Sequence, residues 1–121
     1  MIKRLDRLDV ATTDLPGTAS IYQQNFGFKV TDGPGADCAT VTVGGAEIRL
    51  TAGAAAADAL KAGGEGMFGL WLEAENLDEA IASLKKAGVT IGAIHREEGR
   101  RAVAIDPEAA NKVPLFIFDR K

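Results

Sequence analysis

The sequence predicts an α+β fold built from two tandem β-α-β-β-β modules within one domain. Two observations carry this prediction. An apolar strand that runs into a helix occurs twice, about 60 residues apart, first at Leu8 and again at Phe68. Each helix is then followed by three short strand candidates separated by turn residues. Because the same elements recur in the same order, both copies are expected to bury their apolar faces in the same way.

The first copy begins with a strand over residues 7–12, in which apolar and polar side chains alternate. Asp14-Leu15-Pro16 then gives a helix start with proline in the first turn, and the helix is expected to end at Gly27. Gly44-Gly45 is a strong signal for a two-residue hairpin. The three strands of this copy are predicted at residues 28–31, 39–43 and 46–51.

The second copy has a strand over residues 68–73 and a helix that begins after Asn76. Asn76-Leu77-Asp78-Glu79 is a capping-box pattern, in which the asparagine accepts from the amide of Glu79. Lys85-Lys86 place positive charge in the last turn, where the helix dipole favours it. Strands are predicted at residues 89–94, 101–105 and 113–118, and Asp106-Pro107 separates the last two.

The Ala/Gly-rich stretch of residues 52–66 joins the two copies. Residues 55–62 have the composition of a short helix, but we interpret the whole stretch as a surface linker or a mobile flap. The expected organisation is therefore module one at residues 3–51, a linker at residues 52–66 and module two at residues 67–119, within a single domain.

Composition and charge narrow the function classes. The chain is 46% hydrophobic and 26% charged, which is the balance of an ordinary soluble domain. Its net charge is −3, with cations and anions interspersed, whereas a nucleic-acid surface needs clustered Lys and Arg. Early charges interrupt any signal peptide, no apolar run is long enough to span a membrane, and Cys38 is the only cysteine. We therefore expect a cytoplasmic protein without nucleic-acid or membrane partners.

Four segments resemble the vicinal oxygen chelate superfamily of glyoxalases, bleomycin-resistance proteins and extradiol dioxygenases. They are Leu8-Asp9-Val10-Ala11-Thr12-Thr13-Asp14-Leu15, Ile21-Tyr22-Gln23-Gln24-Asn25-Phe26-Gly27-Phe28, Leu84-Lys85-Lys86-Ala87-Gly88-Val89 and Ile105-Asp106-Pro107. Their order and duplicate spacing carry the resemblance, which covers nearly the whole chain. It implies two modules whose mostly antiparallel sheets curl around a common bowl, with helices outside and a ligand inside. It also implies a homodimer, in some members with modules exchanged between chains.

Strand alternation independently indicates which side chains line this bowl. If Leu8, Leu70 and Leu72 face the helices, the residues between them must face the other way. The residues predicted on the bowl face are Arg7, Asp9, Glu47, Arg49, Trp71, Glu73, Phe116 and Phe118.

Enzymes of this family usually hold a divalent metal through one residue from the first and one from the last strand of each module, commonly His, Glu or Gln. The matching positions here are Arg7, Arg49, Gly69 and Phe116, and an alternative count from Asn111 gives Pro114 in place of Phe116. Arginine has only donors and stays protonated, while glycine and phenylalanine side chains offer no ligand atom. A carboxylate site for Mg²⁺ or Mn²⁺ from Asp9, Glu47 and Glu73 is chemically conceivable, but the two arginines would repel the cation. We therefore expect no metal and no other cofactor.

The charged residues of the bowl face have two interpretations. In the first, Arg7 pairs with Glu47, or Asp9 pairs with Arg49, and the ion pairs close part of the bowl. In the second, Arg7 and Arg49 bind an anionic or carbonyl-bearing ligand. Both interpretations can hold at once.

The aromatic residues of this face suggest the rest of a ligand site. Trp71 and Phe116 are expected to stack against a planar part of the ligand, while Glu73 or Asp9 accepts a hydrogen bond from it. Trp71 would alternatively cover a dimer interface. The single histidine, His95, has no orienting partner at fixed spacing and is expected at the surface.

Two function classes follow. The first is a metal-free protein that binds a planar or anionic small molecule in the bowl between the modules, similar to the drug-sequestering members of the family. The second is an enzyme of the lyase, isomerase, epimerase or dioxygenase type, using unrecognised ligands or metal-free chemistry with Asp9 or Glu73 as base. We favour the binding protein, because the usual ligand positions are lost. A bowl without function, in a protein that acts by association, would explain that loss equally well.

Overall fold

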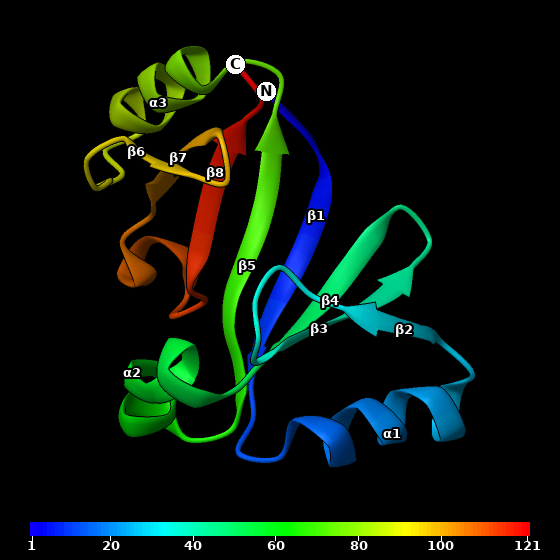
Figure 1. The fold of residues 1–121 in the computed structure, drawn as a ribbon. Helices are drawn as coiled ribbons and strands as arrows, with labels where there is room; N and C mark the ends of the chain where they lie inside the picture. The colour runs from blue at the N-terminus through cyan, green and yellow to red at the C-terminus, as the bar shows by residue number, and fades with distance from the viewer. The chain divides into compact units, whose positions relative to one another are not determined.

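The chain folds as an α+β protein with its elements in the predicted order (Figure 1). The computed structural model describes residues 1–121. Its elements are β1 (Ile2–Ala11), α1 (Leu15–Phe26), β2 (Lys29–Asp32), β3 (Cys38–Val43), β4 (Ala46–Thr51), α2 (Gly53–Gly63), β5 (Gly66–Ala74), α3 (Leu77–Lys86), β6 (His95–Glu97), β7 (Arg100–Ala104), the 3-10 helix η1 (Pro107–Ala110) and β8 (Leu115–Asp119). No helix is both long and apolar enough to cross a membrane.

Backbone pairing confirms the duplicated modules. The strands are hydrogen-bonded in the order β2-β3-β4-β1-β5-β8-β7-β6, so each copy places its fourth strand beside its first. The pairs β1–β4 and β5–β8 are parallel, whereas β2–β3, β3–β4, β6–β7 and β7–β8 are antiparallel. The predicted α+β class with a mostly antiparallel sheet is therefore confirmed.

The fold divides into two compact units. We call residues 7–68 the N-unit, and residues 1–6 together with 69–121 the C-unit. The unit boundaries run through β1 and β5, so the first part of β1 belongs with the second copy rather than with the first. In the C-unit, this part of β1 lies beside β5, where the Glu75 amide donates to the Met1 carbonyl at 3.3 Å.

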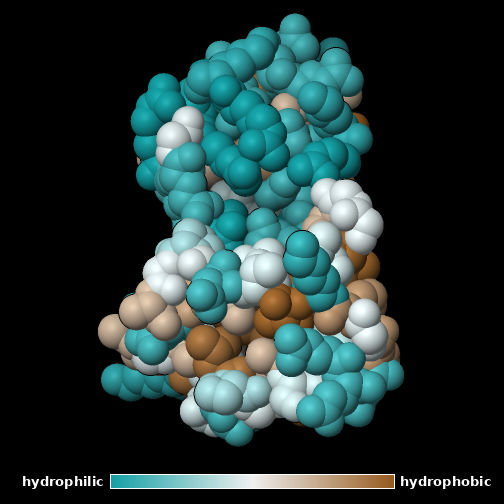
Figure 2. Space-filling view, turned by 45° about the vertical axis from the view of Figure 1, so that its right-hand side comes forward, coloured by the Kyte–Doolittle hydropathy of each residue, from teal (hydrophilic) through white to brown (hydrophobic).

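In the N-unit, α1 packs on the sheet β2–β3–β4. Its N-cap is Asp14, whose Oδ1 accepts from the Gly17 amide at 3.1 Å, and it ends at Gly27 with a φ of 70°. The buried residues beneath it are Ala39, Val41 and Leu50. Phe26, at the end of α1, is 62% exposed although its ring contacts Tyr22 and Phe28. Figure 2 shows hydrophobic residues at the surface of this unit.

The stretch that joins the copies is helical rather than irregular. We expected a linker or flap at residues 52–66, but Gly53–Gly63 forms α2, with Ala56 fully buried. Alanine has the highest helix propensity, and burial of one face adds the packing that a short helix needs. Just after α2, the carboxylate of Glu65 accepts from the amide and the hydroxyl of Thr13 at 2.8 and 2.7 Å, which lowers the pKa of Glu65.

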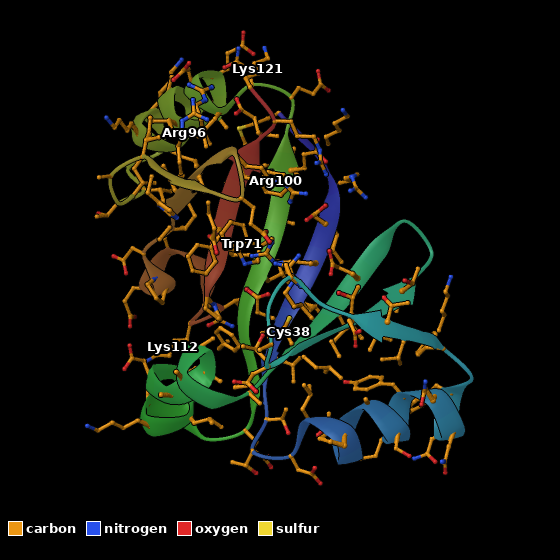
Figure 3. All side chains as sticks on the ribbon, viewed as in Figure 1. Cys38, Trp71, Arg96, Arg100, Lys112 and Lys121 are labelled. Atoms are coloured by element: carbon orange, nitrogen blue, oxygen red, sulfur yellow. The ribbon has the colours of Figure 1, made fainter.

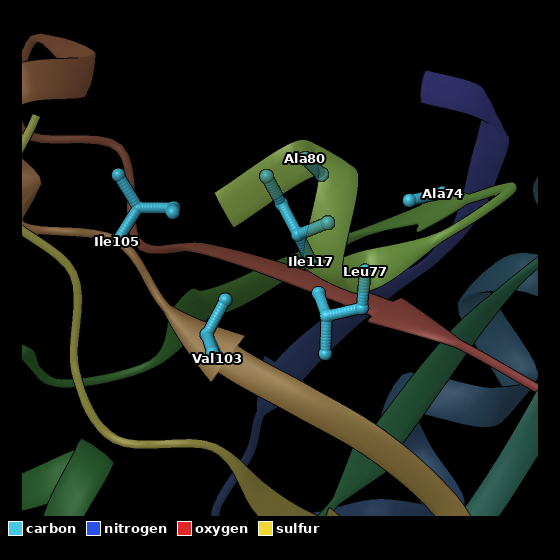
Figure 4. Close-up of a cluster of buried hydrophobic side chains, with 6 residues drawn as sticks. All are labelled: Ala74, Leu77, Ala80, Val103, Ile105 and Ile117. Atoms are coloured by element: carbon cyan, nitrogen blue, oxygen red, sulfur yellow. The ribbon is translucent and has the colours of Figure 1, made fainter. Parts of the chain in front are cut away.

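In the C-unit, α3 covers the sheet β5–β8–β7. As predicted, the Asn76 side chain caps the helix by accepting from the Glu79 amide at 3.2 Å. Figure 4 shows the apolar side chains gathered between α3 and the strands. The cluster consists of Ala74, Leu77, Ala80, Val103, Ile105 and Ile117.

One predicted strand of the second copy is misplaced. Residues 89–94 were expected to be a strand, but they pair only through an isolated bridge between Ile91 and Ile105, and β6 begins at His95. The physical reason lies in the turn that follows. Glu98 and Gly99 both have positive φ, at 53° and 77°, so they form a two-residue hairpin turn that sets the pairing of β6 with β7.

Asp119 joins α3 to the sheet. Its carboxylate is 1% exposed and accepts from the Leu77 amide, at the start of α3, at 2.8 Å. Arg101 donates to the same carboxylate from Nε at 3.1 Å and from Nη2 at 2.6 Å, and its Nη1 reaches Asp78 at 3.2 Å. The hydrogen bonds from Arg101 outweigh burial and lower the pKa of Asp119 to about 2.

We expect Asp119→Asn to lower the free energy of unfolding at pH 7 by about 3 kcal/mol, because Arg101 loses its buried partner. The folded carboxyl has the lower pKa, so the pair stabilises the fold above the ordinary Asp pKa of 3.8 and the stabilisation is lost as pH falls toward about 2. Urea unfolding from pH 7 to pH 2 measures both effects. Asp78→Asn, at an exposed partner of Arg101, should change stability by less than about 0.5 kcal/mol. An unchanged acid limb in Asp119→Asn would contradict the assignment.

Lys112 has a left-handed backbone, with a φ of 67°, directly after Asn111, whose φ is 54°. A non-glycine residue pays about 1–2 kcal/mol for this conformation. Lys112→Gly should therefore raise the free energy of unfolding by about 0.5–1 kcal/mol, even though glycine adds freedom to the unfolded chain. Lys112→Ala is the matched control, because it removes the same side chain but keeps the strain. Equal stability of the two variants in thermal unfolding would contradict this account.

Candidate functional site

An aromatic group lies on the face of the C-unit sheet opposite α3. The parallel register of β5 and β8 sets Trp71 beside Phe116, and β7 sets Ala102 beside Phe118. Trp71, Ala102 and Phe118 are buried together, with Phe116 partly buried against them. The predicted alternation is thus confirmed for these strands. We call Trp71, Phe116 and Phe118 the aromatic group.

The rings of the aromatic group contact one another directly. Trp71 and Phe116 are stacked, with centroids 4.5 Å apart and planes at 9°, and the tilted Phe118 ring lies 6.1 Å from Trp71. Trp71 is only 4% exposed. A separation of 4.5 Å leaves no space for a third ring, so a planar ligand would stack on the outer side of Phe116.

Buried carboxylates border the aromatic group on the same face. Glu73 accepts from Arg4 Nε at 2.9 Å and from Arg120 Nε at 3.1 Å, with Lys3 Nζ at 3.8 Å. Burial by itself would raise the pKa of Glu73, but the hydrogen bonds from Arg4 and Arg120 outweigh it and lower this pKa. Glu73 is therefore an ionised, fully engaged acceptor.

Asp6 is the second buried carboxylate and is 5% exposed. It accepts from Arg4 Nη2 at 2.7 Å, Arg100 Nη1 at 3.1 Å and Arg120 Nη2 at 3.4 Å. We call Lys3, Arg4, Asp6, Glu73, Arg100 and Arg120 the ion-pair cluster. Two of its guanidinium groups also lie over the Phe118 ring, Arg100 at 4.8 Å and Arg120 at 5.6 Å from its centroid. Figure 3 labels Trp71 on β5 and Arg100 at the start of β7.

Sequence reasoning missed five members of this cluster, Lys3, Arg4, Asp6, Arg100 and Arg120. The first three precede the predicted strand 7–12, whereas β1 already begins at Ile2. Arg100 and Arg120 fall just outside the predicted strands 101–105 and 113–118. The high density of arginine and lysine at residues 3, 4, 100 and 120 was the only available signal.

Four charged residues of β1 and β4 lie on the face of the N-unit opposite α1. The register of β1 and β4 sets Arg7 beside Glu47 and Asp9 beside Arg49, so the signs alternate. Arg7 Nε donates to Asp9 Oδ1 at 3.0 Å, and Arg49 Nη2 donates to Glu47 Oε1 at 3.3 Å. Ion pairs are therefore present, and these two join residues two apart on the same strand. The other carboxylate oxygen of Glu47, Oε2, is buried without a hydrogen-bond partner.

The donor set does not fit a metal ion in either unit. The family positions in the N-unit are held by Arg7 and Arg49, both engaged with carboxylates, and those in the C-unit by Gly69 and Phe116. No group of three or more His, Cys, Asp or Glu side chains converges on one point. Since a metal needs several converging donors, we derive no step through one.

Two further reactive side chains, His95 and Cys38, lie outside the aromatic group and the ion-pair cluster. His95 is exposed, as predicted, and lies 3.8 Å from Glu97 on the same short strand. Cys38 is partly buried, and desolvation raises the pKa of its thiol, which disfavours the nucleophilic thiolate.

The fold and this site define a protein of the paired β-α-β-β-β class. The chain belongs to the Glyoxalase/Bleomycin resistance protein/Dioxygenase superfamily, whose family model matches residues 4–112. The resemblance seen in the sequence is thereby confirmed. No protein of curated function matches the chain significantly.

Solved structures share this fold at low identity. A hypothetical protein from Bacillus halodurans C-125 superposes with a TM-score of 0.84 at 18% identity, over 98% of this chain and 94% of that one. Methylmalonyl-CoA epimerase from Mycobacterium tuberculosis gives 0.81 at 22% identity, over 99% and 89%. A variant of the Streptomyces coelicolor methylmalonyl-CoA epimerase in complex with 2-nitronate-propionyl-CoA gives 0.80 at 19% identity, over 98% and 95%.

We expect the purified, tag-free protein to retain less than about 0.1 equivalent of Zn²⁺, Ni²⁺, Mn²⁺ or Fe²⁺ after incubation and desalting, because the family positions offer no converging donors. Elemental analysis measures this retention. His95→Ala controls for weak surface coordination by the exposed histidine. Near-stoichiometric metal in both proteins would overturn the donor assignment.

Proposed function

We propose that this protein binds a planar or anionic small molecule and does so without a metal. The observation that carries the proposal is the aromatic group of the C-unit, in which a partly exposed Phe116 ring is backed by the buried Trp71 ring at 4.5 Å. A ring held in this way is a rigid stacking surface. Ligand sites are typically apolar surfaces with a few fixed polar groups, and the ion-pair cluster supplies such groups on the same face.

The rigid packing of the aromatic group lowers the free-energy cost of binding a ligand. Trp71 is fixed by both phenylalanines of the aromatic group, so Phe116 keeps one orientation before a ligand arrives. A preorganised site avoids the ordering cost of binding, which is about 0.5–1.5 kcal/mol for each immobilised side chain. Stacking of an aromatic ligand on Phe116 would add about 0.5–1.5 kcal/mol beyond the apolar area that it buries.

The charged face of the N-unit supports recognition of a polar group. Its arginines are paired with Asp9 and Glu47 along the same strands, so these four residues together carry no net charge. The unpartnered Glu47 Oε2 is an acceptor that an N–H or O–H of a ligand would satisfy.

An enzyme of the epimerase, lyase or dioxygenase type is the second candidate, favoured by the shared fold with methylmalonyl-CoA epimerases. The surroundings of the two candidate bases, Asp9 and Glu73, disfavour an enzyme. Asp9 accepts from Arg7 at 3.0 Å, and Glu73 is engaged by Arg4 and Arg120 with a lowered pKa. A carboxylate stabilised as an anion is a weaker base. Turnover of a bound molecule would decide for the enzyme.

A cytoplasmic location and a homodimer complete the proposal. The location follows from the sequence pattern, and the homodimer follows from the usual assembly of the family. Light scattering of the purified protein measures the oligomeric state.

We expect N-phenyl-1-naphthylamine, a neutral aromatic probe, to bind at one site with energy transfer from Trp71. Phe116→Leu keeps an apolar side chain but removes the ring, so the affinity should fall about threefold to tenfold with loss of stacking. Fluorescence titration measures both proteins.

Phe26→Leu is the matched control, because it makes the same change at a ring of α1 that is 62% exposed. If the probe shows no saturable binding, or if both variants lose affinity equally, the aromatic group is not the binding surface.

A further inference from the structure

We propose that Arg100 forms an oxyanion-binding subsite beside the aromatic group, so that the ligand is an aromatic carboxylate, sulfonate or phosphate. This inference rests on the proposed function and names the chemical class of its ligand. The sequence pattern predicted anion binding at Arg7 and Arg49, in the N-unit, and did not point to Arg100.

The charge balance of the ion-pair cluster favours an anion. Four cations, Lys3, Arg4, Arg100 and Arg120, contact the two carboxylates Asp6 and Glu73. Glu97 lies opposite Arg100 in the β6–β7 register and is about half exposed, and the cluster keeps an excess positive charge when Glu97 is counted. The whole chain has a net charge of −3, so this is a local exception.

Arg100 is the member of the cluster that is both fixed and accessible. Its Nη1 donates to Asp6 at 3.1 Å and its guanidinium carbon lies 4.8 Å from the Phe118 centroid. These two contacts hold the planar group in one orientation, while its side chain remains 23% exposed. The guanidinium also carries donors on Nε and Nη2, which suit the paired oxygens of a carboxylate, sulfonate or phosphate. Arg120 and Lys3 are more exposed, and Arg120 already donates from Nε and Nη2 to Glu73 and Asp6.

The position of Arg100 connects the anion to the rings. Phe118 contacts Arg100 on one side and the tilted Trp71 ring on the other, 6.1 Å away, and Trp71 is stacked on Phe116. Charge and aromatic surface therefore adjoin on one sheet face. A ligand that joins a planar ring to an oxyanion matches both features, whereas a neutral ring uses only the second.

The test compares two probes with closely related ring systems. 8-Anilinonaphthalene-1-sulfonate carries an oxyanion, and N-phenyl-1-naphthylamine lacks it. We expect Arg100→Gln to weaken the sulfonate about tenfold, the usual loss for one charge-assisted hydrogen bond, and to change the neutral probe less than twofold. Raising NaCl should weaken only the sulfonate.

Arg96→Gln is the matched control, since it removes the same charge from the same hairpin. Arg96 lies opposite Arg101 in the β6–β7 register, on the α3 side of the sheet (Figure 3). It should leave both probes unchanged. Arg100→Lys, which keeps the charge but not the planar fork, should fall between wild type and Arg100→Gln, and it serves if the glutamine variant does not fold.

The outcomes separate the two proposals. If neither probe binds at a single site, the proposed function fails. If the neutral probe binds normally and Arg100→Gln leaves the sulfonate unchanged, or weakens both probes alike, the subsite is overturned while the proposed function stands. In that case Arg100 only ties β7 to Asp6.

Discussion

Two buried carboxylates, Asp6 and Glu73, impose the constraint on which the aromatic face of the C-unit sheet depends. A carboxylate removed from water is tolerated only when cations and donors replace that water. Arg4 and Arg120 each contact both carboxylates, and Arg100 completes the set at Asp6. The first part of β1 and the strands β5, β7 and β8 must therefore keep the register that brings these side chains together. The same register stacks the aromatic group.

The positions that hold metal ligands in the family carry other chemistry in this chain. In the N-unit, Arg7 and Arg49 are neutralised by acids two residues away on their own strands. In the C-unit, Phe116 contributes a ring to the aromatic group instead of a ligand atom. These replacements suit recognition by charge and stacking, in which the protein supplies fixed groups and leaves the bound molecule unchanged.

Local signals predicted most elements because their causes are local. The Asn76 cap, the Gly27 helix end and the Gly44-Gly45 hairpin each depend on neighbouring residues. Alternation placed Trp71 and Phe116 on one face because the strand pleat has a period of two. Such rules need no knowledge of the rest of the chain.

Tertiary structure alone decided the contents of the site. Asp6 lies before the predicted strand 7–12, and its place in the ion-pair cluster depends on Arg100 and Arg120, which are far away in the sequence. The strand expected at 89–94 moved to His95–Glu97 because the turn at Glu98 sets the register. The sequence by itself thus determined the class of fold and the residue types at the family's metal positions, which follow from residue identity and spacing. Contacts between residues far apart in the chain decided which charged side chains lie against which aromatic rings. No local pattern encodes such contacts.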